Sequence, residues 1–176
     1  PRKEWTILFP GDEIGGIVFT GTAMQDPNYA VNGLDRRKAF IPQDNLAREG
    51  DQNFVVIRYA EMLLNLAEAE NELNGPAGAY APINRVRTRV GLPVLPDGLS
   101  QAEMREAIKH ERRGELAFEG HYYFDLLRWG PEDMQAAMES IDEPGNTRTF
   151  SPRVMLWPIP QRELDVNPNL TQNPLW

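Results

Sequence analysis

The chain has 176 residues, of which 41% are hydrophobic, a formal net charge of −8 and no cysteine. This length allows a sizeable core, whereas the acidic balance and the lack of a basic run argue against nucleic acid or an anionic membrane surface as the main partner. The absence of cysteine excludes disulfides, thiolate zinc sites and cysteine nucleophiles. No run is long and apolar enough to span a bilayer, and no secretion signal is present. Because the chain begins at Pro1 without a methionine, we expect a processed or partial product.

Residues 1–52 are predicted to be irregular, because glycine and proline recur throughout them. Within this part, residues 16–20 predict a short strand. The first helix is predicted over residues 54–74, where polar residues at spacings of three and four form one narrow stripe on an otherwise apolar cylinder. That pattern is typical of a helix covered on several sides. A second helix is predicted over 77–90, and the short connection between the two indicates an antiparallel hairpin.

A third helix is predicted over residues 100–119, because Ser100 and Glu103 have the spacing of a capping box. Two shorter helices are predicted over 121–129 and 131–139, the last beginning at a proline. Helical hairpins of about 35 residues therefore occur twice, a period that suits tetratricopeptide-like stacking.

The predicted fold is mainly α, with tetratricopeptide-repeat-like antiparallel helical hairpins, long irregular loops and an extended C-terminal tail. We expect a single region in which residues 1–52 are irregular, residues 53–139 form the helical repeats, and residues 140–176 form a loop and the extended tail. Within the last part, Val154–Trp157 predicts a short strand or extended segment.

The segment Glu111–Gly130, ERRGELAFEGHYYFDLLRWG, mixes charged and bulky apolar residues unusually densely. In helical phase, Glu111, Glu115 and Glu119 continue the apolar stripe that begins at Met104, so their carboxylates should face the core. Glu111 and Glu115 lie one turn apart and repel each other unless cations pair with them. One interpretation is a structural ion-pair network, which we predict to contain Arg58, Glu111, Arg112, Glu115, Glu119 and Arg128. The alternative is that Glu111 and Glu115 are the acid and base of a hydrolase.

Other catalytic or metal-binding patterns are incomplete. His110 and Glu111 begin a zinc-protease pattern, but position 114 is glycine, and the second histidine, His121, is too distant to share the helical face. The glycines of the first 21 residues match neither the phosphate-loop nor the dinucleotide pattern, and no serine-centred elbow is present. We therefore predict no catalytic residue, no metal site and no cofactor.

Two aromatic residues in loop-like sequence are candidates for ligand contact. Trp5 and Tyr29 lie in the irregular part, and ligand contacts concentrate in such segments. Their planes could stack on the C–H face of a sugar ring, although a role without ligand contact is the favoured interpretation. Trp129 and Trp157 are embedded in apolar sequence, which favours core packing.

Five ordered segments resemble the motifs of one protein family. They are RYAEMLLNLAEAE at 58–70, INRVRTRVGL at 83–92, the segment Glu111–Gly130, WPIP at 157–160 and NPNLTQNP at 167–174. Together they resemble the SusD/RagB family of Bacteroidetes outer-membrane nutrient-binding lipoproteins, over residues 58–174.

The resemblance implies a tetratricopeptide-like fold, exposure on the outer face of the outer membrane, and a lipid anchor that this chain does not contain. It also implies pairing with a SusC-like TonB-dependent transporter and an oligosaccharide ligand, bound without chemistry and delivered for nutrient uptake. It covers only the C-terminal part of the family, whose sugar contacts come largely from upstream and inserted loops, so no binding residue is carried over. Two alternatives stay open: a helical-repeat scaffold that binds a protein partner, and a glycan hydrolase that uses Glu111 and Glu115.

Overall fold

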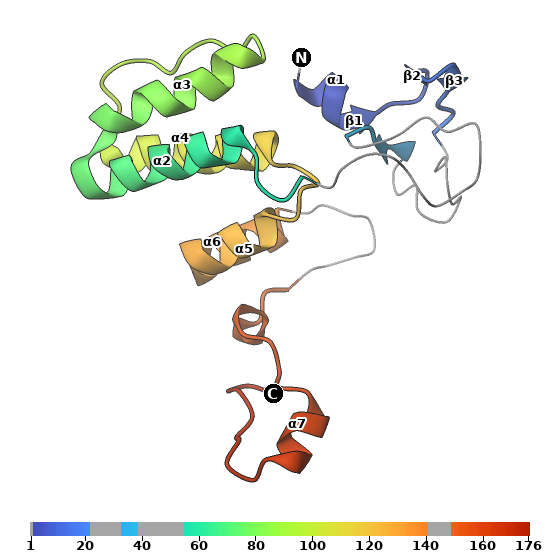
Figure 1. The fold of residues 1–176 in the computed structure, drawn as a ribbon, viewed down its shortest axis with the longest axis vertical. Helices are drawn as coiled ribbons and strands as arrows, with labels where there is room; N and C mark the ends of the chain where they lie inside the picture. The colour runs from blue at the N-terminus through green and yellow to red at the C-terminus, as the bar shows by residue number, and fades with distance from the viewer. Residues whose placement is uncertain (1, 22–32, 39–54, 141–148) are drawn as a thin grey trace. The chain divides into compact units, whose positions relative to one another are not determined.

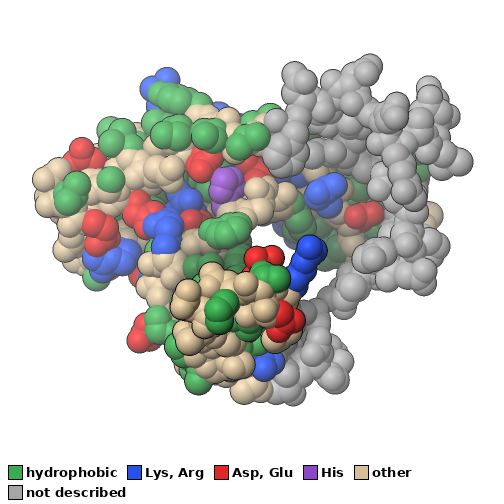
Figure 2. Space-filling model, turned by 60° about the horizontal axis from the view of Figure 1, so that its bottom comes forward, with side chains coloured by type: hydrophobic (Ala, Val, Ile, Leu, Met, Phe, Trp, Pro, Cys, Tyr) green, Lys and Arg blue, Asp and Glu red, His purple; other side chains and the backbone are tan. Residues whose placement is uncertain are grey.

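The structure is a computed structural model that describes residues 2–21, 33–38, 55–140 and 149–176. These residues are mainly helical, which confirms the predicted fold class. No helix in this part of the chain is long and apolar enough to cross a membrane. Figure 2 shows acidic and basic side chains interspersed over the visible face of the described residues, rather than gathered into one basic area.

The chain groups into two compact units, Pro1–Glu119 and Gly120–Trp176. The first unit contains α1 (Arg2–Thr6), β1 (Ile7–Leu8), β2 (Glu13–Ile14), β3 (Ile17–Val18), β4 (Asp35–Arg36), α2 (Tyr59–Asn74), the 3-10 helix η2 (Pro76–Ala79), α3 (Tyr80–Arg89) and α4 (Gln101–Glu115). The second unit contains α5 (Tyr122–Trp129), α6 (Pro131–Glu139), the 3-10 helix η3 (Pro152–Met155) and α7 (Gln161–Val166).

In the first unit, α2 and α3 form the predicted hairpin, and α4 packs against α2 (Figure 1). Helix α2 begins at Tyr59 rather than at residue 54, because the backbone of Arg58 is extended, with φ of −131° and ψ of 158°. It ends at Asn74, and the capping residue Gly75 has a φ of 83°, in the left-handed region that glycine tolerates best. The helix therefore starts later than its apolar pattern predicts and stops where the sequence indicates.

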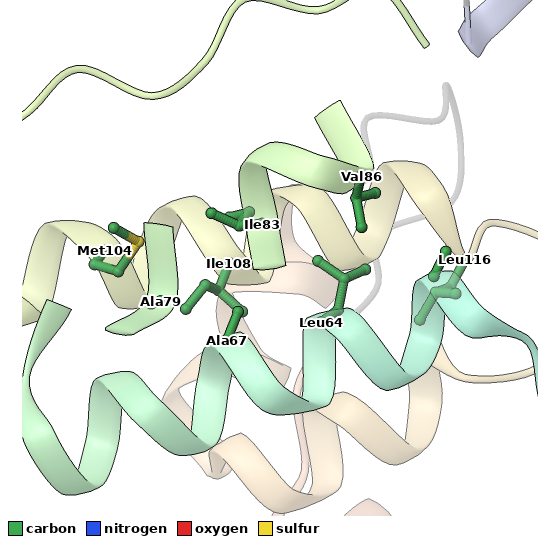
Figure 3. Packing of buried hydrophobic residues seen from close by; sticks show 9 residues of the cluster. Leu64, Ala67, Ala79, Ile83, Val86, Met104, Ile108 and Leu116 are labelled. Atoms are coloured by element: carbon green, nitrogen blue, oxygen red, sulfur yellow. The ribbon is translucent and has the colours of Figure 1, made fainter. Parts of the chain in front are cut away.

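The core of the first unit lies between α2, α3 and α4. Figure 3 shows side chains from these three helices pointing toward one another, with Ala79 of η2 beside them. The buried cluster consists of Ala60, Leu64, Ala67, Ala79, Ile83, Val86, Met104, Ile108 and Leu116. Burying a side chain as large as leucine or isoleucine stabilises a fold by about 1.5–3 kcal/mol before the entropy cost, so this cluster holds the three helices together.

Helix α4 begins with the predicted capping box. The backbone N–H of Glu103 donates to Oγ of Ser100, and the Glu103 carboxylate accepts from the backbone N–H of Ser100. The helix ends at Glu115 rather than at residue 119. A turn follows, in which Phe118 has a φ of 63° and Gly120 a φ of 84°, and these values are incompatible with a continuing α-helix.

The N-terminal part contains structure that was not predicted. Helix α1 forms at the start of the predicted irregular region, where Oγ1 of Thr6 donates to the carbonyl of Arg2. Strand β1 pairs antiparallel with β4, and β2 pairs antiparallel with β3 through a turn at Gly15–Gly16. Both glycines have positive φ, as the tight turns of two-residue hairpins require. Strand β3 falls within the predicted strand at 16–20.

In the second unit, α5 and α6 pack together, and both match the predicted helices. Gly130 separates them with a φ of 118°, and Pro131 occupies the first turn of α6.

The C-terminal part agrees only partly with its prediction. Val154 and Met155 lie in the 3-10 helix η3, which Pro152 begins, whereas the backbone of Leu156 is extended, with φ of −145° and ψ of 119°. The predicted extended tail also contains the short helix α7 after Pro160. Gln172 holds the tail together, because its side chain accepts from the N–H of Ile159 and donates to the same residue's carbonyl. The fixed φ angles of Pro152 and Pro160 favour the starts of η3 and α7.

Candidate functional site

Three glutamates mark the C-terminal end of α4. Helical spacing places Glu111 and Glu115 on the buried face, where their side chains are 1% and 3% exposed. Glu119 lies in the turn that follows and is partly exposed. A carboxylate at such depth needs cationic partners, and each of the three has at least two.

Glu111 is held between two guanidinium groups. Nη2 of Arg2, on α1, donates to Oε1 at 2.7 Å. Nη1 of Arg87, on α3, donates to Oε2 at 2.8 Å. Glu111 thus joins the N-terminal segment to the helical hairpin through one carboxylate.

Glu115 is surrounded by three guanidinium groups. Nη1 of Arg58 and Nη2 of Arg89 both donate to Oε1, at 2.6 and 2.8 Å. Nε of Arg2 lies 2.9 Å from Oε2, an ion-pair distance, although the two atoms are not aligned as a hydrogen bond. Three segments that are distant in sequence therefore converge on this carboxylate.

Glu119 is paired with Arg58 and Lys38. The Arg58 guanidinium binds its carboxylate in a bidentate manner, with Nε at 2.6 Å from Oε2 and Nη2 at 2.9 Å from Oε1. Lys38 forms a further ion pair with Oε1. Partial burial would raise the pKa of Glu119, but the hydrogen bonds from Arg58 and Lys38 outweigh it and hold the pKa below its ordinary value.

Arg58 also stabilises the end of α4 itself. Its Nη2 donates to the backbone carbonyl of Glu115 at 2.6 Å, and Nζ of Lys38 donates to the same carbonyl at 2.7 Å. The last carbonyls of a helix lack helical partners and carry partial negative charge, so cations there are favourable. Burial disfavours the charged form of Arg58, but its hydrogen bonds to Glu119 and Glu115 prevail and raise its pKa above the ordinary value.

The structure brings together four residues of the predicted network, Arg58, Glu111, Glu115 and Glu119. For the other two, Arg112 and Arg128, it shows the following contacts. Arg112 is buried on α4, where its Nη1 donates to Oδ1 of Asn65 on α2 at 2.6 Å. Arg128 lies on α5 in the second unit, where its Nη2 is 2.9 Å from Oδ1 of Asp125. The phase of Arg128 on its own short helix, three residues after an aspartate, directs it to that local partner.

Four further cations belong to the cluster although the predicted network omits them: Arg2, Lys38, Arg87 and Arg89. Arg87 and Arg89 both lie on α3, so the arginines of the second predicted helix were a usable signal. Arg2 lies 109 residues from Glu111, and Lys38 lies 77 residues from Glu115. No local pattern could have indicated these two pairings.

Beside the cluster, the first unit contains a cavity of about 610 Å³. It is lined by Arg2, Trp5, Thr6, Lys38, Arg58, Arg89, Val90 and Glu115. Trp5, a candidate for ligand contact, is 72% exposed, and the guanidinium carbon of Arg37 lies 5.4 Å from the centre of its ring. Tyr29, the other aromatic candidate, lies outside the described residues.

The two buried glutamates are fully engaged by cations. All four carboxylate oxygens of Glu111 and Glu115 lie within 2.9 Å of guanidinium nitrogens. Among the described residues, no group of three or more histidine, aspartate or glutamate side chains could hold a metal ion.

A helical hairpin and α4, joined by a buried carboxylate–guanidinium cluster, define a mainly helical scaffold. The family model described as the SusD family matches residues 1–176, and the chain belongs to this family. SusD-like protein P25 from Formosa agariphila is 44% identical, over 97% of this chain and 38% of that protein.

Solved structures give the same family. A SusD-like protein from Bacteroides fragilis superposes with a TM-score of 0.79 at 28% identity, over 99% of this chain and 38% of its own. Surface glycan-binding protein A from Bacteroides uniformis superposes with a TM-score of 0.72 at 28% identity, over 98% of this chain and 37% of its own. The chain therefore spans less than two-fifths of the length of these proteins.

Proposed function

We propose that this protein is a cell-surface glycan-binding protein that captures oligosaccharides and passes them to a SusC-like TonB-dependent transporter for nutrient uptake. It acts on the outer face of the outer membrane, held by a lipid anchor in the full-length polypeptide. The observation that carries the proposal is the family match over residues 1–176, together with the likeness to a surface glycan-binding protein over 98% of this chain.

Binding proceeds without bond cleavage. The only paired carboxylates that the sequence offered as acid and base, Glu111 and Glu115, are both held by guanidinium groups. These ion pairs support the idea that this part of the protein positions binding surfaces rather than carrying out chemistry.

Affinity electrophoresis tests the glycan-binding proposal. The full-length protein is run in native gels with and without dissolved neutral, uronate-containing or sulfated polysaccharide, beside serum albumin as a non-binding reference. We expect at least one polysaccharide to retard the full-length protein relative to albumin, without release of reducing ends from that polysaccharide. A mobility that no polysaccharide changes would contradict glycan binding, and release of reducing ends that Glu115→Gln abolishes while the variant stays folded would favour the hydrolase instead.

Membrane extraction tests the transporter partner. We expect the full-length protein to co-purify with a TonB-dependent transporter after gentle solubilisation. Recovery of the protein without any transporter, under conditions that keep other outer-membrane complexes intact, would contradict this part of the proposal.

A protein-binding scaffold is the second candidate, because α2 exposes a row of apolar side chains opposite its buried face. Tyr59, Met62, Leu66 and Leu73 follow helical spacing and are all exposed. Replacing Leu66 with lysine would leave glycan retention unchanged but would abolish capture of a protein partner. Retention on a polysaccharide that Leu66→Lys does not alter would favour the glycan-binding proposal.

A further inference from the structure

The cavity beside the glutamate cluster carries more positive than negative charge. In the described part of the chain, five cationic side chains (Arg2, Lys38, Arg58, Arg87 and Arg89) form ion pairs with the three carboxylates of the cluster, those of Glu111, Glu115 and Glu119. Two positive charges of the cluster are therefore not neutralised by its own glutamates. The whole chain has a net charge of −8, so this excess is local and opposite in sign to the rest of the protein.

The excess charge lies where solvent reaches the cavity. Arg2 and Arg58 are tied to two glutamates each and are mostly buried. Arg89 is 58% exposed, and its contact with Glu115 uses Nη2 alone. A guanidinium has five N–H donors in a flat fork that matches a carboxylate or sulfate, so Arg89 keeps donors for a bound anion.

An exposed aromatic ring lines the same cavity. Trp5 is held on α1 beside Arg2, whose guanidinium is fixed by Glu111 and Glu115. An indole plane can pack against the C–H face of a pyranose ring while its edges stay wet. The volume of about 610 Å³ lies within the range of small-molecule sites, about 300–1,000 Å³.

We propose that this cavity binds an acidic sugar unit, with the ring against Trp5 and the anionic group against Arg89 and Lys38. This inference rests on the proposed glycan-binding function and names its ligand class. The anionic group is either the carboxylate of a uronate or a sulfate ester. Each of these groups presents two oxygens that a guanidinium can bind bidentately.

The test follows the indole N–H resonances in a two-dimensional nitrogen–proton spectrum of the 176-residue chain. Each of galacturonate, galactose 6-sulfate and galactose is titrated in turn, and Trp5→Phe assigns the Trp5 signal by its loss. We expect the Trp5 signal to shift with one or both acidic sugars and not with galactose. The sugar that shifts it identifies whether the site takes a carboxylate or a sulfate.

Arg89→Gln and Arg85→Gln form a matched pair of variants on α3. Both remove one positive charge from an exposed position of the same helix, but Arg85 lies over the ring of Tyr59 and does not line the cavity. We expect Arg89→Gln to raise the Kd for the acidic sugar about tenfold or more, as loss of a charge-assisted hydrogen bond implies. Arg85→Gln should leave it within about twofold. Glu115 retains Arg2 and Arg58 in the Arg89 variant, so the fold should persist, and thermal unfolding checks this.

The outcomes separate this inference from the proposed function. A Trp5 signal that moves with neither acidic sugar, or that moves equally with galactose, overturns the acidic site even if polysaccharide gels retard the chain. Equal weakening by Arg89→Gln and Arg85→Gln also overturns it, because the effect would then be one of overall charge. Retardation by neutral polysaccharide alone would uphold glycan binding and reject the acidic ligand.

Discussion

Removing the charge of Glu115 tests whether the carboxylate cluster holds the first unit together. Glu115→Gln keeps the shape of the side chain but leaves the guanidinium groups of Arg2, Arg58 and Arg89 without this partner. Breaking a buried ion pair on one side typically costs about 3–5 kcal/mol. Arg2 and Arg58 each keep a second glutamate, and Arg89 can turn to solvent, so we expect a loss near the lower end, about 3 kcal/mol.

Urea unfolding followed by far-ultraviolet circular dichroism measures this loss through the helices of the first unit. With an m-value of about 2 kcal/mol/M, the unfolding midpoint should fall by about 1.5 M. Glu106→Gln is the matched control on the same helix, because Glu106 is exposed and forms a local ion pair with Lys109 at 3.0 Å. That variant should change stability by no more than about 0.5 kcal/mol. If Glu115→Gln shifts the midpoint no further than Glu106→Gln does, the cluster does not stabilise the fold and the reasoning is refuted.

Three further predictions concern the core, the capping box and pH. Leu64→Ala should lower the free energy of unfolding, measured in urea, by about 2–5 kcal/mol, because it leaves a cavity at a fully buried site. Leu73→Ala, on the exposed face of α2, should lower it far less. Equal losses would contradict the assigned core. Ser100→Ala should lower the free energy of unfolding by about 1 kcal/mol, read from the thermal midpoint, and an unchanged midpoint would contradict the role of the capping box. The pKa of Glu119 is lowered in the folded state, so its contribution to stability is complete above its unfolded pKa and is lost as the pH falls through the folded pKa. Stability measured between neutral and acidic pH should therefore fall less steeply in Glu119→Gln than in the parent chain, and parallel profiles would contradict the assignment.

The helices that the sequence predicted well are those whose pattern is local. Apolar spacing over several turns located α2, α3 and α4, because a helix of that length buries one face whatever else surrounds it. The same spacing placed Glu111 and Glu115 on the buried face of α4, where the structure has them. The position of a glutamate on the helical face thus predicted its burial, although its partners could not be predicted in the same way.

What the sequence did not reveal depends on distant contacts or on very short segments. Helices α1 and α7 have five and six residues, too few for an apolar period to stand out. The start of α2 was predicted too early because residues 55–57 are apolar, although the extended backbone at Arg58 excludes them from the helix. The pairing of Arg2 with Glu111 spans 109 residues, and only the folded chain brings these groups together.

The arginines of the cluster differ in how deeply they are buried, and this difference bears on what each one contributes. Arg2 and Arg58 lie under the surface, and each is bound to two carboxylates, so their charges are used within the protein. Arg89 shares Oε1 of Glu115 with Arg58 and is the most exposed of the three guanidinium partners of Glu115 among the described residues. Glu115 keeps Arg2 and Arg58 when Arg89 is replaced, so we expect the fold to depend on Arg89 least, and the acidic-sugar proposal directs its exposed guanidinium toward the ligand. The acidic-sugar proposal therefore predicts that Arg89 is dispensable for stability but required for binding an anion beside Trp5.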